Sequence, residues 1–234
     1  MNESLAALAE ALDVVRRTCG DRSPEALAPG ELMAVNEAFG ALRRRVDAAY
    51  LPVAAEINRQ SRPELGKDSF AKKQGFRSSA TLISATTGTS VGEAQRTVAV
   101  GEATAPRTTF TGEARPPKHP HVAAAVTAGS IGVPASSAII TMLDRVALRA
   151  DPGALNQMER TLADAAAGPT LDQLQKLVQR AEAYLDPDGL EPRESELYGD
   201  RSLTLREDRT GAMSSPGSSI PSWGRRSRCR SKAW

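Results

Sequence analysis

Apolar residues recur at helical spacing along most of the chain. Near the N-terminus they fall three or four residues apart, on one face of an amphipathic helix: Leu5, Leu8, Leu12 and Val15. A longer stretch keeps a near-heptad stripe: Leu32, Val35, Phe39, Leu42, Val46, Ala49, Val53 and Ile57. The stripe predicts one long helix that contributes to the core. We expect a kink at Pro52, because proline cannot donate the backbone hydrogen bond of a helix interior.

The middle of the chain reads as a helix, a glycine turn and a second, capped helix. Ser79 is a candidate cap for the first helix, and the turn covers residues 87–90. Ser90 and Glu93 have the spacing of a capping box, in which each side chain accepts from the backbone N–H of the other residue. The unit is helix-turn-helix-like, and residues 122–146 echo it weakly.

Two later helices are predicted to form an αα-hairpin, followed by one strand. Asp151-Pro152 opens the first helix, Gly168-Pro169 ends it, and Thr170 caps the second. Residues 201–208 then alternate apolar and polar positions like a strand that leads into a turn. Residues 212–221 show no alternation and contain two prolines, so we expect no returning strand to pair with it.

Composition favours an all-α fold. Hydrophobic residues make up 40% of the chain but aromatic residues only 4%, so the core is built from aliphatic side chains that suit close helix packing. The predicted architecture is a multi-helix domain with a long kinked helix, helix-turn-helix-like units, an αα-hairpin and a short β remnant. We assign residues 1–211 to this helical domain and residues 212–234 to a disordered basic tail.

The tail differs sharply from the rest of the chain. It holds both tryptophans and five basic residues but no Asp or Glu, and the first 211 residues hold no tryptophan. Of the net charge of +2, the tail supplies +5, which leaves −3 on the helical domain. A mildly acidic domain argues against strong non-specific DNA binding. Two origins of the tail stay open: out-of-frame translation of GC-rich DNA, or a natural disordered segment basic enough to touch nucleic acid.

The chain lacks the signals of a secreted or membrane protein. It has two cysteines, an acidic N-terminus without a signal-peptide pattern, and no apolar run near the ~20 residues that a membrane span needs. Too few cysteines are present for a disulfide scaffold. We expect a cytoplasmic protein with no membrane partner.

Two motifs with catalytic associations have simpler interpretations. Ser90 lies in a G-x-S-x-G pattern, residues 88–92, but no parallel-sheet pattern surrounds it and capping accounts for it. His119 and His121 form the chain's only histidine pair, and no third ligand supports a metal site. We therefore predict no catalytic residue, metal, cofactor or small-molecule ligand in this chain.

The charge pattern indicates a surface that could contact nucleic acid. The stretch from Arg59 to Arg77 carries six basic and two acidic residues, a local charge of +4. Our candidate phosphate contacts are Lys72, Lys73 and Arg77 in this stretch, and Arg96 on the second helix of the helix-turn-helix-like unit. The competing interpretations are that the basic run is a solvated surface and that the unit is plain helix packing.

Three stretches in a fixed order carry a family resemblance. They are residues 82–94 (LISATTGTSVGEA), residues 121–131 (HVAAAVTAGSI), and residues 185–189 (LDPDG) followed by 201–205 (RSLTL). Together they resemble the domain of unknown function 222 family, also called the 13E12 repeat family, over about residues 5–213. Its members are helical and often carry a C-terminal HNH endonuclease module. No residue here matches an HNH motif, so the resemblance transfers no catalytic residue and implies a truncated member without nuclease activity.

Three functions follow from these patterns. The first is a non-catalytic helical module of HNH endonuclease-associated proteins that binds nucleic acid, with DNA as the partner. The second is a protein–protein interaction or oligomerisation module driven by the stripe from Leu32 to Ile57, with another protein or a second copy as the partner. The third, a serine hydrolase at Ser90, predicts labelling by an active-site serine reagent, which we do not expect.

Overall fold

The structure is a computed structural model of the 234-residue chain. It describes residues 3–20, 23–108, 112–187, 206–207 and 213–214. The predicted disordered tail, residues 212–234, lies outside these ranges apart from residues 213–214. The described chain is predominantly helical, which confirms the predicted all-α class.

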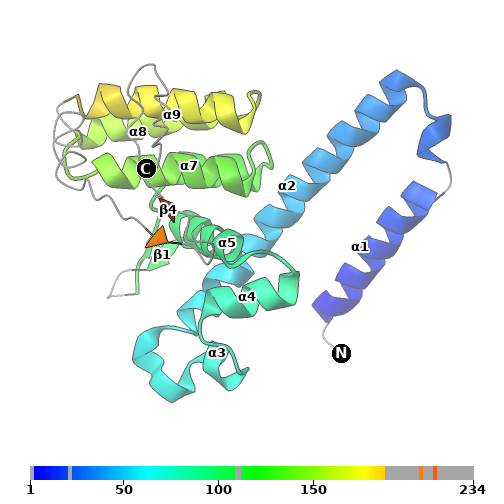
Figure 1. Ribbon diagram of the computed structural model, residues 1–234, viewed down its shortest axis with the longest axis horizontal. Helices are drawn as coiled ribbons and strands as arrows, with labels where there is room; N and C mark the ends of the chain where they lie inside the picture. The colour runs from blue at the N-terminus through cyan, green and yellow to red at the C-terminus, as the bar shows by residue number, and fades with distance from the viewer. Residues whose placement is uncertain (1–2, 21–22, 109–111, 188–205, 208–212, 215–234) are drawn as a thin grey trace, which may run out of the picture.

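Helices follow one another along almost the whole described chain (Figure 1). The first half holds α1 (Glu3–Gly20), η1 (Pro24–Ala26), α2 (Pro29–Arg59), η2 (Pro63–Asp68), α3 (Phe70–Lys73), α4 (Ser79–Thr87) and α5 (Val91–Thr104). The second half holds α6 (Pro120–Thr127), α7 (Val133–Val146), α8 (Pro152–Ala165) and α9 (Leu171–Leu185).

Two short antiparallel hairpins accompany the helices. β1 (Arg107–Thr108) pairs with β2 (Ala114–Arg115), and β3 (Arg206–Glu207) pairs with β4 (Met213–Ser214). The expectation that the C-terminal strand lacks a partner is wrong, because Arg206 lies opposite Ser214 and Glu207 opposite Met213. Residues 201–205 of the predicted strand lie outside the described residues.

Cap residues define the helix starts, as the sequence predicts. Ser90 and Glu93 form the predicted capping box on α5, with Glu93 N donating to Ser90 Oγ at 3.1 Å. Asp151 and Thr170 cap α8 and α9. For α4 the prediction was one residue off: Ser78 is the cap, and Ser79 is the buried first helical residue, which donates from Oγ to Asn58 Oδ1.

Helix α5 lies at the centre of the fold. It packs against α2, α4, α6 and α7, while α7 packs against α8 and α9. Two apolar clusters result. The larger lies among α2, α5, α6, α7, α8 and α9, and the smaller, around Leu82 and Ile83, joins α2, α3, α4 and α5. Gly101 permits the closest approach of α5 to α2, since a Cβ there would lie 2.6 Å from the carbonyl oxygen of Leu51.

Helix α2 contributes to both clusters, but not through its apolar stripe. Its buried residues are Leu51 and Ala54. The stripe itself is solvent-exposed, and we call it the exposed stripe: Leu32, Val35, Phe39, Leu42, Val46, Ala49 and Val53. At about 100° per residue, Leu51 points ~140° away from Val46 around the helix. The expectation that the stripe builds the core is therefore wrong for these seven residues, although Ile57 does pack against the smaller cluster.

The N-terminal half of α2 extends away from the other helices, and α1 is attached at its outer end through η1 (Figure 1). Leu5, Leu8 and Leu12 on the predicted face of α1 are also more than half exposed. Helix α2 runs through Pro52 as one helix of 31 residues.

Candidate nucleic-acid interface

Residues 59–77, which we call the basic lobe, form a separate projection at the C-terminal end of α2. Phe70 N donates to Gln60 O at 2.8 Å, which folds the lobe back on the end of α2, and Phe76 N donates to Ala71 O at 2.8 Å within the lobe. Ala71 is fully buried, and Phe70 and Phe76 pack against the smaller apolar cluster. A few apolar anchors thus hold the lobe while its charged side chains face water.

Two of the six cations in the basic lobe are paired with carboxylates. Arg59 Nη2 lies 2.5 Å from Glu56 Oε1, and this hydrogen bond is the main reason that the pKa of Glu56 falls to about 2. Lys73 Nζ lies 3.1 Å from Asp68 Oδ1. Both pairs are exposed, so each contributes little to stability.

The other four cations are exposed and form no ion pair with any described residue: Arg62, Lys67, Lys72 and Arg77. Their charges are therefore available to an anionic partner. Arg77 directly precedes Ser78, the cap of α4, so it lies beside the positive end of the helix dipole.

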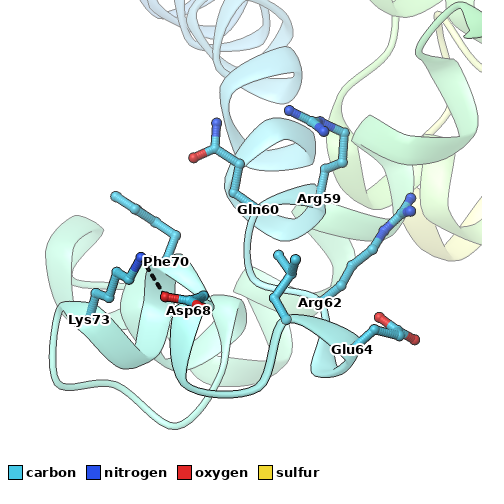
Figure 2. A pocket seen from close by; sticks show the side chains of 8 residues that line it. Arg59, Gln60, Arg62, Glu64, Asp68, Phe70 and Lys73 are labelled. Carbon is cyan, nitrogen blue, oxygen red and sulfur yellow. Dashed lines mark ion pairs between the residues drawn. The ribbon is translucent and has the colours of Figure 1, made fainter.

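A hollow of about 670 Å³ lies within the basic lobe. Its lining combines cations, carboxylates and apolar residues: Arg59, Gln60, Arg62, Glu64, Leu65, Asp68, Phe70 and Lys73. Figure 2 shows Arg59 and Arg62 on one side of the hollow and the Lys73–Asp68 pair on the other. This arrangement suits contact with an extended anion better than enclosure of a small ligand.

Three of the four predicted contact residues lie in the basic lobe, as their sequence positions require, and one of them, Lys73, lines its hollow. Lys72, Lys73 and Arg77 belong to the basic lobe, whereas Arg96 lines a different hollow together with Arg43. The predicted helix–glycine turn–helix is present as α4, a left-handed Gly88 and α5. Helix α5 packs against four other helices, while Gln95 and Arg96 in its N-terminal half stay exposed.

A buried polar cluster at the start of α6 escaped the sequence analysis. His119, the residue before α6, is 7% exposed, and its Nε2 lies 2.9 Å from Asp144 Oδ1 on α7. Lys118 Nζ reaches the same oxygen at 2.7 Å. The interpretation of His119 as a plain loop residue is therefore incomplete, since it joins α6 to α7.

Glu159 of α8 completes this cluster and caps α6. Only 4% exposed, it accepts hydrogen bonds at Oε1 from the backbone N–H groups of His121 at 2.7 Å and Val122 at 3.0 Å. Its Oε2 lies 3.8 Å from His119 Nδ1. Burial alone would raise the pKa of Glu159, but the His119 side chain and the two N–H donors outweigh it and lower the pKa.

A sequence signal for this cluster did exist. Glu159 lies on the inward side of α8, four residues after Leu155 and three before Leu162. A carboxylate on an apolar face needs a buried partner, but the partner lies almost 40 residues away in the sequence. Among the described residues, the structure holds no group of three His, Cys, Asp or Glu side chains arranged to bind a metal ion.

Ser90 has the surroundings of a cap and not of a nucleophile. Its hydroxyl accepts from Glu93 N and contacts Glu93 Oε2 at 3.2 Å.

None of the described helices is long and apolar enough to cross a membrane.

The fold and surface define a helical domain with an exposed basic lobe. A family model, "Domain of unknown function (DUF222)", matches residues 33–225. The chain therefore belongs to the domain of unknown function 222 family. No curated protein and no solved structure matches it.

Proposed function

We propose that this protein is a non-catalytic, nucleic-acid-binding helical module of the HNH endonuclease-associated kind. The observation that carries the proposal is the set of four exposed cations of the basic lobe, Arg62, Lys67, Lys72 and Arg77, which no described carboxylate neutralises. Such a surface contacts phosphates and reads no bases, so we expect DNA binding that is independent of sequence and, with a net charge of −3 on residues 1–211, weak at physiological salt.

Anisotropy titrations of a labelled duplex, from about 50 to 200 mM NaCl, test this proposal. Affinity should fall steeply with salt, because each phosphate contact contributes about 0.9 to the slope of log K against log salt. The double variant Lys72→Ala/Arg77→Ala should weaken binding and reduce that slope by about 2.

The matched control is Lys176→Ala/Arg180→Ala on α9. Both residues are exposed and form no ion pair with a described residue, so the control removes the same charge from another surface. Equal loss of binding in the two double variants, or no salt-dependent binding of the wild type, would contradict the proposal. Incubation with supercoiled plasmid and Mg²⁺ or Mn²⁺ tests the non-catalytic part, for which we expect no nicking.

A further inference from the structure

The exposed stripe is the largest feature of the described structure that nucleic-acid binding leaves unexplained. Large apolar side chains that are 39–67% exposed gather on α1 and α2: Leu5, Leu8, Leu12, Leu32, Met33, Val35, Phe39, Leu42, Val46 and Val53. Monomeric proteins rarely expose a contiguous apolar patch of more than a few hundred Å². Spread over two helices at regular spacing, this surface indicates a missing helical partner.

We propose that the exposed stripe binds a second copy of this chain, with the two α2 helices antiparallel and the two α1 helices completing a four-helix bundle. The heptad spacing of the stripe is that of a helix packed along its length against another helix. The available area agrees with this. At roughly 80 Å² for each of the ten side chains, one copy offers about 800 Å², the size of a standard interface per partner.

Charge selects the antiparallel orientation. Glu31 flanks the exposed stripe near the start of α2, and the exposed Arg43 and Arg45 flank it 12 and 14 residues later. Arg44 turns toward its own domain and donates from Nε to Gly129 O at 2.7 Å. Parallel helices would place Arg43 and Arg45 of the two copies side by side, which is repulsive. Antiparallel helices centred at Glu37 instead place Glu31 of each copy level with Arg43 of the other.

The same centre produces matched apolar layers. Leu32 of one copy lies level with Leu42 of the other, and Val35 lies level with Phe39. Gly40 has only Arg44 near its Cβ position, at 3.4 Å, and Ala34, Ala38 and Ala41 are also small, so the backbones can approach closely near the two-fold axis. The rest of each domain contacts α2 from about Arg43 onward, where Arg44 Nε donates to Gly129 O at 2.7 Å, so the two domains lie toward opposite ends of the antiparallel pair.

Sedimentation equilibrium of the full chain tests the proposal. We expect a dimer of twice 24.8 kDa at micromolar concentration. Because a two-fold interface contains each substitution twice, Phe39→Lys should raise the dimer Kd at least about 100-fold. Helicity and melting temperature at low concentration should stay unchanged, because Phe39 lies outside both apolar clusters. The control is Leu148→Lys, at a residue 98% exposed and distant from the stripe, which should leave the Kd unchanged.

Charge reversal tests the orientation. Glu31→Arg and Arg43→Glu should each weaken the dimer. The double variant should bind more tightly than Glu31→Arg, because the opposed pair is rebuilt with reversed signs while both of these variants lack the Glu31 cap on Ala28 N. A protein that stays monomeric up to about 100 μM, well above the Kd range of specific dimers, would overturn the proposal. So would a dimer that Phe39→Lys does not affect, or sedimentation of the monomer with phosphatidylglycerol vesicles through the stripe.

Discussion

Replacing Glu159 with alanine tests the buried polar cluster, because this one carboxylate caps α6 and faces His119. The substitution leaves the N–H groups of His121 and Val122 without their acceptor, and Val122 is fully buried. A hydrogen bond to a charged group contributes about 1.5–3 kcal/mol, and an orphaned buried donor costs about 1–3 kcal/mol. We expect a loss of about 3–5 kcal/mol in the free energy of unfolding, the range for breaking a buried charged pair.

Glu159→Gln separates charge from hydrogen bonding in the same position. The amide oxygen still accepts from the two N–H groups, so the loss should be about 1–2 kcal/mol, the value of a carboxylate at a partly buried helix N-terminus. Urea unfolding monitored by far-UV circular dichroism measures both variants against the wild type.

The pH dependence of the same experiment supplies a check on the charge. Because the pKa of Glu159 is lower in the folded state than its ordinary value of 4.5, ionisation stabilises the fold above pH 4.5. This contribution is lost as the pH falls through the folded-state pKa. The gap between wild type and Glu159→Gln should therefore shrink as the pH falls below 4.5. A loss below about 1 kcal/mol for Glu159→Ala, or a gap that does not shrink, would refute the assigned role.

Three smaller changes test the packing and the turns. Gly101→Ala should lower the free energy of unfolding by about 1–3 kcal/mol, because the new Cβ would lie 2.6 Å from Leu51 O. The control is Gly92→Ala in the same helix, whose Cβ would meet no atom closer than 4.0 Å. Parallel thermal melts should show a loss of stability for Gly101→Ala only. Ser90→Ala should cost about 1 kcal/mol of stability through the lost cap, while wild-type Ser90 should resist a fluorophosphonate probe; labelling at this residue would count against the capping role. Gly88→Ala should destabilise by about 1 kcal/mol in urea titrations because φ is +69° there, and a neutral result would show that the turn relaxes.

Local signals predicted the helix ends well. The cap residues Ser90, Asp151 and Thr170 bond only to residues within their own first turn, so three or four residues of sequence contain the whole interaction. The sequence predicted the first strand of the β3–β4 hairpin but not the second. A strand of two residues, such as β4, is too short to show the apolar–polar alternation that reveals a strand.

The sequence did not predict what surrounds the exposed stripe or the cluster around His119. A heptad pattern says that one face of α2 is apolar, but it does not say which molecule covers that face. Leu51 and Ala54 are the residues of α2 that do enter the core. They belong to no periodic apolar pattern, so only the packed fold identifies them as core residues. His119 contacts carboxylates 25 and 40 positions away in the sequence, and no local spacing encodes such a pairing.

The length of α2 sets a distance scale for target binding if both proposals hold. From Glu37 to Arg59 the helix spans 22 residues, about 33 Å at a rise of 1.5 Å per residue. An antiparallel pair therefore holds its two basic lobes at most about 65 Å apart, close to two turns of B-DNA at ~34 Å each. Duplexes shorter than about 20 bp would reach one lobe, and longer ones would bridge both. Helix α2 would then act as a spacer, so that affinity rises in a step with the length of the DNA while remaining indifferent to its sequence.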